Sequence, residues 1–171
     1  MTAGHVRIAA VAAGATLALA CAVAVCQEDL SDHSHHSLMK TEAVEYLFPE
    51  QVTVPVGKPS AIALHFRIRQ ELHINSHKPH NQYLIPTEFS IPESSGVRLA
   101  AAVYPDGSDF TLPADPSEKL SVYTGEFTIQ TKMVATAGDH LVEAKLRFQA
   151  CDQNACMPPK TITVPIDVIG K

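Results

Sequence analysis

The sequence predicts an all-β domain, built as an antiparallel sandwich, after a hydrophobic leader and a polar linker. Three observations support this fold class. Several segments alternate apolar and polar residues, which is typical of strands with one face on a core and one in water. Turn residues separate these segments at short intervals. No segment after the leader has an apolar stripe at helical spacing.

Residues 1–26 form the leader. The run from Ile8 to Cys26 contains no charged residue, and Arg7 stands just before it. A short basic start followed by an apolar run is typical of an export signal. The run is also long enough to remain as a membrane anchor, and lipidation of Cys21 or Cys26 is a further alternative. In each case we expect a periplasmic or other extracytoplasmic domain, free or attached to the membrane, in a compartment where disulfides persist.

Residues 27–41 contain little that could pack, and we predict a flexible linker. Three histidines fall close together here, at His33, His35 and His36. Neutral imidazole is a common ligand of zinc and copper, but a solvated polar linker accounts for the same residues. We therefore predict no resident metal and no cofactor.

Residues 42–171 form the predicted folded domain. Period-two alternation marks strands around Ile62 to Ile68, Phe127 to Met133, Val142 to Ala150 and Ile162 to Val168. Seven or more such strands separated by turns predict an immunoglobulin-like antiparallel β-sandwich. Residues 105–120 contain prolines and a glycine and read as the longest irregular stretch, and long loops of this kind often cover or bind something.

The two cysteines outside the leader, Cys151 and Cys156, are separated by four residues. They can close on each other, so thiol-disulfide chemistry is the first function to consider. A structural staple is the alternative, although a loop of about six residues gains only roughly 2 kcal/mol in the chain-entropy model. The alternation of residues 142–150 predicts that Cys151 faces water, where an attacking thiolate can reach it. A bulge just before Cys151 would reverse that prediction.

Pro158 and Pro159 follow the second cysteine and supply no backbone donors. We therefore expect strand pairing to stop just after Cys156 and to resume in a last strand over residues 160–169. The two cysteines would then lie at the end of the hairpin that joins residues 142–150 to this last strand.

The segment from His140 to Val168, with its two cysteines followed by Met157-Pro158-Pro159, resembles the N-terminal domain of the bacterial thiol:disulfide interchange protein DsbD. Weaker matches are Leu72 to Pro79 with Leu84 to Thr87, and Val122 to Glu126. Together they cover most of residues 44–169. The resemblance independently implies an immunoglobulin-like fold.

The resemblance also implies a function. Cys151 and Cys156 would accept electrons from a thioredoxin-like donor and pass them to oxidised periplasmic client proteins. The second cysteine would contact the thioredoxin-like partner. In that family an aromatic loop covers the disulfide, and Phe110 is the candidate by its order along the chain; packing of Phe110 into the core is the alternative.

Tyr123 lies in the strand that follows this loop in the family. Met157 and Pro158 stand beside Cys156, where the interrupted ladder exposes an edge for an incoming chain. We therefore expect these three residues to contribute to partner binding or to the cover. Proteins of that family continue into a membrane segment and a thioredoxin-like domain, whereas the printed sequence ends at Lys171. We therefore expect either that a separate partner supplies the electrons or that the redox role has been lost.

Composition excludes other classes of function. The chain has 13 basic and 18 acidic residues, a formal net charge of −5, and its basic residues are scattered, which argues against nucleic-acid binding. It lacks a glycine-rich phosphate loop and a Gly-x-Ser-x-Gly elbow.

Two alternative functions stay open. One is a secreted immunoglobulin-like binding module with a static disulfide. The other is a copper-handling protein that uses the linker histidines, Met157 and the thiols. A metal site formed by His73, His77 and His80 is disfavoured, because their helical spacing conflicts with a strand that runs into a turn.

Overall fold

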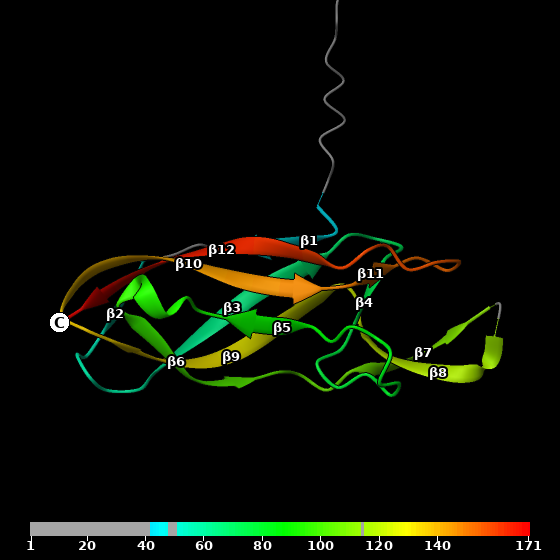
Figure 1. Ribbon diagram of the computed structural model, residues 1–171, viewed down its shortest axis with the longest axis horizontal. Helices are drawn as coiled ribbons and strands as arrows, with labels where there is room; N and C mark the ends of the chain where they lie inside the picture. The colour runs from blue at the N-terminus through cyan, green and yellow to red at the C-terminus, as the bar shows by residue number, and fades with distance from the viewer. Residues whose placement is uncertain (1–41, 48–50, 114) are drawn as a thin grey trace, which may run out of the picture. The chain divides into compact units, whose positions relative to one another are not determined.

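Two four-stranded sheets pack face to face and enclose the main core (Figure 1). The computed structural model describes residues 42–47, 51–113 and 115–171, which all belong to one compact unit. The predicted leader and linker lie outside the described residues. The strands, in chain order, are β1 (Val44–Leu47), β2 (Gln51–Val54), β3 (Ser60–Ile68), β4 (His73–Asn75), β5 (Glu88–Ser90), β6 (Val97–Val103), β7 (Ser108–Leu112), β8 (Asp115–Tyr123), β9 (Glu126–Ala135), β10 (Gly138–Phe148), β11 (Ala150–Cys151) and β12 (Lys160–Gly170).

One sheet has the strand order β1-β3-β9-β6 and the other has the order β2-β12-β10-β5. All pairs are antiparallel except β2 with β12, which is parallel. The inner faces contribute the main core, which includes Leu64 and Ile129 from the first sheet and Leu146 and Val164 from the second. This arrangement confirms the predicted all-β, immunoglobulin-like sandwich.

The alternation of apolar and polar residues in the sequence matches the alternation of buried and exposed residues in the strands. In β3 the residues Ile62, Leu64, Phe66 and Ile68 are buried, while the residues between them are exposed. β9 and β12 follow the same rule over most of their length. Burying one face of each strand removes apolar surface from water, at roughly 25 cal/mol per Å², so the pattern fixes which face of each sheet points inward.

β10 and β12 form a long hairpin with continuous antiparallel register, from Gly138 opposite Gly170 to Phe148 opposite Lys160. The predicted last strand and the predicted hairpin are therefore confirmed. The cysteines lie in the connection between these two strands.

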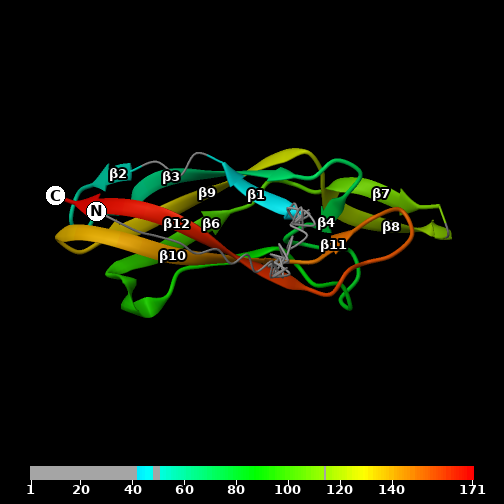
Figure 2. The same ribbon diagram turned by 90° about the horizontal axis from the view of Figure 1, so that it is seen from above.

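A third sheet, with the order β11-β4-β8-β7, lies at the end of the unit opposite the C-terminus in both views (Figures 1 and 2). Its strands β7 and β8 take up most of residues 105–120, so the prediction of a long irregular loop there is wrong. The prolines misled because β7 contains none of them, and Pro116 lies in the part of β8 that pairs with β7 alone, where few backbone donors are needed. Pro116 also lies where the ladder shifts register, between Thr111 opposite Lys119 and Leu112 opposite Asp115.

Helical structure is confined, within the described residues, to the short 3₁₀ turn η1 (Glu93–Ser95). In that same part of the chain, none of the helices is long and apolar enough to cross a membrane.

Two leucines of β10 allow a matched test of this packing. Leu146 is completely buried, whereas Leu141 is 74% exposed. Leu146→Ala should lower the free energy of unfolding by about 2–5 kcal/mol, because it removes buried methyl groups and leaves a cavity. Leu141→Ala should change it by less than about 0.5 kcal/mol. Urea unfolding followed by circular dichroism measures both, and equal losses would contradict the assignment of faces in β10.

Candidate functional site

Cys151 and Cys156 are joined by a disulfide at the end of β11, as the sequence predicts. The connecting loop is a tight turn in which the backbone N–H of Asp152 donates to the carbonyl of Ala155 at 3.0 Å. Oδ1 of Asp152 in turn accepts hydrogen bonds from the backbone N–H groups of Asn154 and Ala155, at 2.7 and 2.9 Å. An aspartate that caps its own turn in this way fixes the loop without any buried apolar residue.

The same hydrogen bonds stabilise the charged form of the carboxylate. They lower the pKa of Asp152, and the nearby His73 lowers it further. Asp152 therefore carries a negative charge at neutral pH, next to the first cysteine.

The two cysteines differ sharply in exposure. Cys151 is completely buried, whereas Cys156 is exposed. The prediction that Cys151 faces water is therefore wrong, although its face was predicted correctly. Ala150 belongs to the main core, and strand alternation places the next side chain, that of Cys151, on the opposite face. That second face is itself covered.

The cover can be located from the strand that pairs with β11. Cys151 lies directly opposite His73, and Ala150 lies opposite Ile74, which is also a main-core residue. His73 and Cys151 therefore point to the same side, away from the main core. The ring of Phe110 from β7 packs on His73 there, with 4.2 Å between ring centroids.

Gln149 lies where the chain stops pairing with β12 and starts pairing with β4, and its hydrogen bonds fix the backbone there. Its carbonyl accepts the backbone N–H of Asn75 at 3.3 Å, and its Oε1 accepts from Nδ2 of Asn75 at 3.2 Å. Its Nε2 donates to the carbonyl of Met157 at 3.2 Å, while the N–H of Met157 donates to Ala150. These bonds connect the strands on both sides of the disulfide.

His73 is a residue of this site that the sequence analysis considered only as a metal ligand. Its side chain is buried, and within the described residues its Nε2 has no hydrogen-bond partner. Burial lowers the pKa of His73, and the carboxylate of Asp152 opposes this by raising it. No local pattern could have identified His73, because its position next to Cys151 comes from the pairing of two distant segments.

Phe110 is half-buried and is not a member of the main core. It lines a small cavity of about 330 Å³ together with His73 and Gln153, a residue of the cysteine loop. The predicted lid residue is thus adjacent to the disulfide loop.

Tyr123 is buried, and its ring stacks on Phe127. Its hydroxyl donates to the carbonyl of Pro105 at 2.9 Å and accepts the backbone N–H of His77 at 3.0 Å. The hydroxyl therefore attaches the segment before β7 to the segment after β4. Burial raises its pKa, so this hydroxyl keeps its proton.

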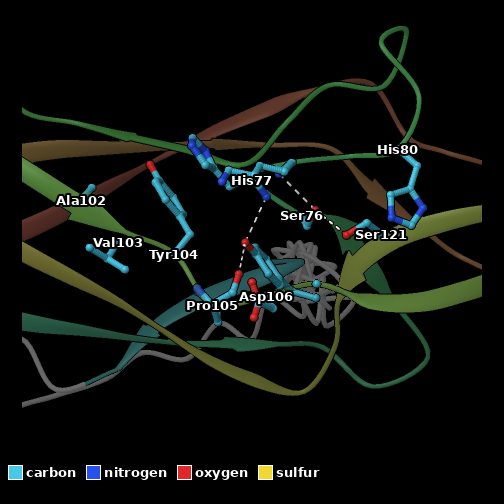
Figure 3. Close-up of a pocket in the computed structure, with 12 residues that line it drawn as sticks. Ser76, His77, His80, Ala102, Val103, Tyr104, Pro105, Asp106 and Ser121 are labelled. Atoms are coloured by element: carbon cyan, nitrogen blue, oxygen red, sulfur yellow. Dashed lines mark hydrogen bonds between the residues drawn. The ribbon is translucent and has the colours of Figure 1, made fainter.

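Gly107 completes this attachment. A Cβ atom there would collide with Oγ of Ser121 and lie 2.8 Å from Cβ of Ser76, two residues whose hydroxyls are hydrogen-bonded to each other (Figure 3). Only glycine lets the chain approach so closely. β7, and with it Phe110, is positioned by these contacts.

A separate cavity of about 670 Å³ lies beside these residues and is lined by no cysteine (Figure 3). Its histidines are engaged with the protein itself. His77 stacks on Tyr104 and its Nδ1 lies 3.0 Å from the carbonyl of Thr87, while Nδ1 of His80 lies 3.1 Å from that of Lys119. No cluster of three or more metal-ligating side chains occurs among the residues described. The linker histidines considered for copper lie outside them.

Met157 and Pro158, which were predicted to contact a partner, are both exposed and follow Cys156 directly. Residues 157–159 belong to no strand, as expected from the two prolines. A thiol partner can therefore approach Cys156 along this segment.

No family model matches the chain, and the search of curated proteins finds no match. Among solved structures, the chain is similar to the N-terminal domain of DsbD from Neisseria meningitidis in its reduced form, with a TM-score of 0.45 and 15% identity. The similarity covers 67% of this chain and 82% of that chain.

Acid should destabilise the fold through His73. Because the pKa of His73 is lower in the folded protein, the unfolded chain binds the proton more tightly. The free energy of unfolding should therefore fall as pH drops below the ordinary histidine value of 6.5. Urea unfolding of the oxidised protein at about pH 7.5 and about pH 5 measures this change.

His73→Gln should lose less stability than the wild type over the same pH interval. His140→Gln, at the far end of β10, should behave as the wild type does. Equal losses in the wild type and in His73→Gln would show that His73 does not titrate in this way.

Proposed function

We propose that the protein is an extracytoplasmic thiol-disulfide exchange module whose Cys151–Cys156 pair relays electrons between thioredoxin-like partners and oxidised client proteins. The observation that carries this proposal is the asymmetry of the disulfide, with one exposed cysteine and one fully buried cysteine. The resemblance of the segment around the cysteines to the N-terminal domain of DsbD supports the same function.

Asymmetric burial suits exchange because the reaction needs one reachable sulfur and one protected sulfur. A thiolate attacks one sulfur of a disulfide and the other sulfur leaves. Here an incoming thiolate can reach Cys156, so Cys151 is the leaving sulfur. A buried leaving sulfur stays close by and can attack again to release the partner.

The reaction balances as a two-electron transfer. In the dithiol form, the Cys156 thiolate attacks a client disulfide, forms a mixed disulfide and expels one client thiolate. The Cys151 thiolate then attacks Sγ of Cys156, which forms the intramolecular disulfide and releases the second client thiolate. The client is reduced and the pair is oxidised. A thioredoxin-like donor in its dithiol form reverses these steps and restores the pair.

The partner would dock on the exposed segment that follows Cys156. Residues 157–159 are exposed and belong to no strand, so a partner chain can lie along them next to the reacting sulfur. Met157 is 38% exposed and offers an apolar contact, while Pro158 keeps the segment stiff. Phe110 is proposed as the aromatic cover on the buried side, and Tyr123 as the anchor of the strand that carries it.

An export test examines the compartment. The leader should carry the domain across the inner membrane, because its apolar run follows a basic residue. Alkaline phosphatase fused after residue 41 should be active in bacterial cells, whereas the same fusion with two arginines placed within the apolar run should be inactive. Cytoplasmic retention of the first fusion would argue against a redox role.

A trapping experiment tests the roles of the two cysteines. Removing the resolving thiol should trap the mixed disulfide, since the remaining cysteine cannot release its partner. Cys151→Ala, which keeps Cys156, should form abundant mixed disulfide with a thioredoxin that lacks its own resolving cysteine. Cys156→Ala should form little, because Cys151 is buried. Non-reducing electrophoresis measures both.

Equal trapping by the two variants would reject this assignment. Trapping by neither, with an unchanged circular dichroism spectrum, would favour a static binding module. The reduction potential provides an independent check, because structural disulfides typically lie below about −300 mV and exchange modules lie higher.

A further inference from the structure

The side chains of His73 and Cys151 lie next to each other on the covered face of the third sheet. The two residues are directly paired across β4 and β11, and both are buried. Directly paired residues in an antiparallel ladder project to the same side, with Cβ atoms about 4.5–5.5 Å apart. The Phe110 ring closes this face over His73.

In this pair, the Cys151 thiol must lose a proton before it reacts, and the His73 imidazole can accept one. A buried thiol cannot give its proton directly to water, yet only the thiolate attacks a disulfide. Nε2 of His73 is buried and, within the described residues, has no hydrogen-bond partner in the oxidised protein. Buried polar atoms usually have one. A thiol on Cys151 is a donor that exists only in the reduced protein.

We propose that His73 is the proton acceptor for Cys151, so that the imidazole takes the thiol proton as Cys151 attacks the mixed disulfide on Cys156. This inference rests on the proposed exchange function and adds a residue to it. His73 would belong to the reacting site, although the sequence gives it no such role.

The resolving step then balances in protons and electrons. The proton of Cys151 moves to Nε2 of His73, and the resulting thiolate attacks Sγ of Cys156. The bond between Cys156 and the partner sulfur breaks, the partner leaves as a thiolate with the electron pair, and the Cys151–Cys156 bond forms. The imidazolium afterwards loses its proton to solvent, and the partner thiolate takes up a proton from solvent.

The charged groups around His73 are compatible with a temporary positive charge. Asp152, on the β11 side, favours the imidazolium electrostatically. Arg69 and Glu71, from the connection before β4, line the same small cavity and carry opposite charges. β7 contributes Phe110 and the segment after β8 contributes Thr124, neither of which is charged at neutral pH.

A small disulfide reagent can test this step without any protein partner. The reduced full-length chain is mixed with 5,5′-dithiobis(2-nitrobenzoate) in a stopped-flow instrument, and release of 2-nitro-5-thiobenzoate is followed across the pH range. The first phase reports attack by Cys156, and the second reports resolution by Cys151. A variant with alanine at both positions gives the background from Cys21 and Cys26.

His73→Phe keeps an aromatic ring against Phe110 but cannot accept a proton. The second phase should slow by about tenfold at neutral pH, and its rise with pH should shift toward the ordinary thiol range near 8.5, while the first phase stays unchanged. Asp152→Asn retains the acceptor oxygen of the turn and loses the charge. It should shift the second phase in the same direction as His73→Phe, but less.

His140→Phe, at the start of β10, serves as the histidine control and should leave both phases unchanged. An unchanged pH profile of the second phase in His73→Phe would overturn the proposal. If His73→Phe does not fold, an unchanged profile in Asp152→Asn would overturn it as well. A His73-dependent second phase in a protein that fails to trap thioredoxin would retain the role of His73 and reject the proposed partners.

Discussion

The site depends on one change of strand pairing, which takes place at Gln149. Up to Phe148 the chain pairs with β12, and from Ala150 it pairs with β4. The backbone and side chain of Gln149 hold both arrangements, through Asn75 on one side and Met157 on the other. Because the disulfide loop starts two residues later, its position relative to both sandwich and third sheet is set here.

Leaving the sandwich has a consequence for burial. In β10 the face opposite the core is exposed, but in β11 that face is covered because the third sheet carries the β7–β8 hairpin. The hairpin is attached through the Tyr123 hydroxyl and the close approach at Gly107. Phe110 can therefore pack on His73, and the two cysteines acquire different environments although they are bonded to each other.

Much of the fold could be predicted because it is encoded locally. Alternation identified β3, β9, β10 and β12, and the two cysteines with the following prolines identified the loop that carries the disulfide. The burial of Cys151 and the position of His73 beside it could not be predicted. Alternation gives the face on which a side chain lies, but another segment decides whether that face is covered. The β7–β8 hairpin was missed for a related reason, since Pro116 is tolerated only because β8 pairs there with β7 alone and the ladder shifts register.

A static disulfide accounts poorly for the residues around it. Closing so short a loop contributes roughly 2 kcal/mol, while leaving a buried polar group without a partner costs about 1–3 kcal/mol. Next to Cys151 the chain buries such a group, Nε2 of His73. An apolar side chain at that position would pack against Phe110 without this cost. As a stabilising element, the arrangement of disulfide and histidine gains almost nothing. In the proposed reaction the same arrangement has a function, because reduction creates a Cys151 thiol that can donate to Nε2 of His73.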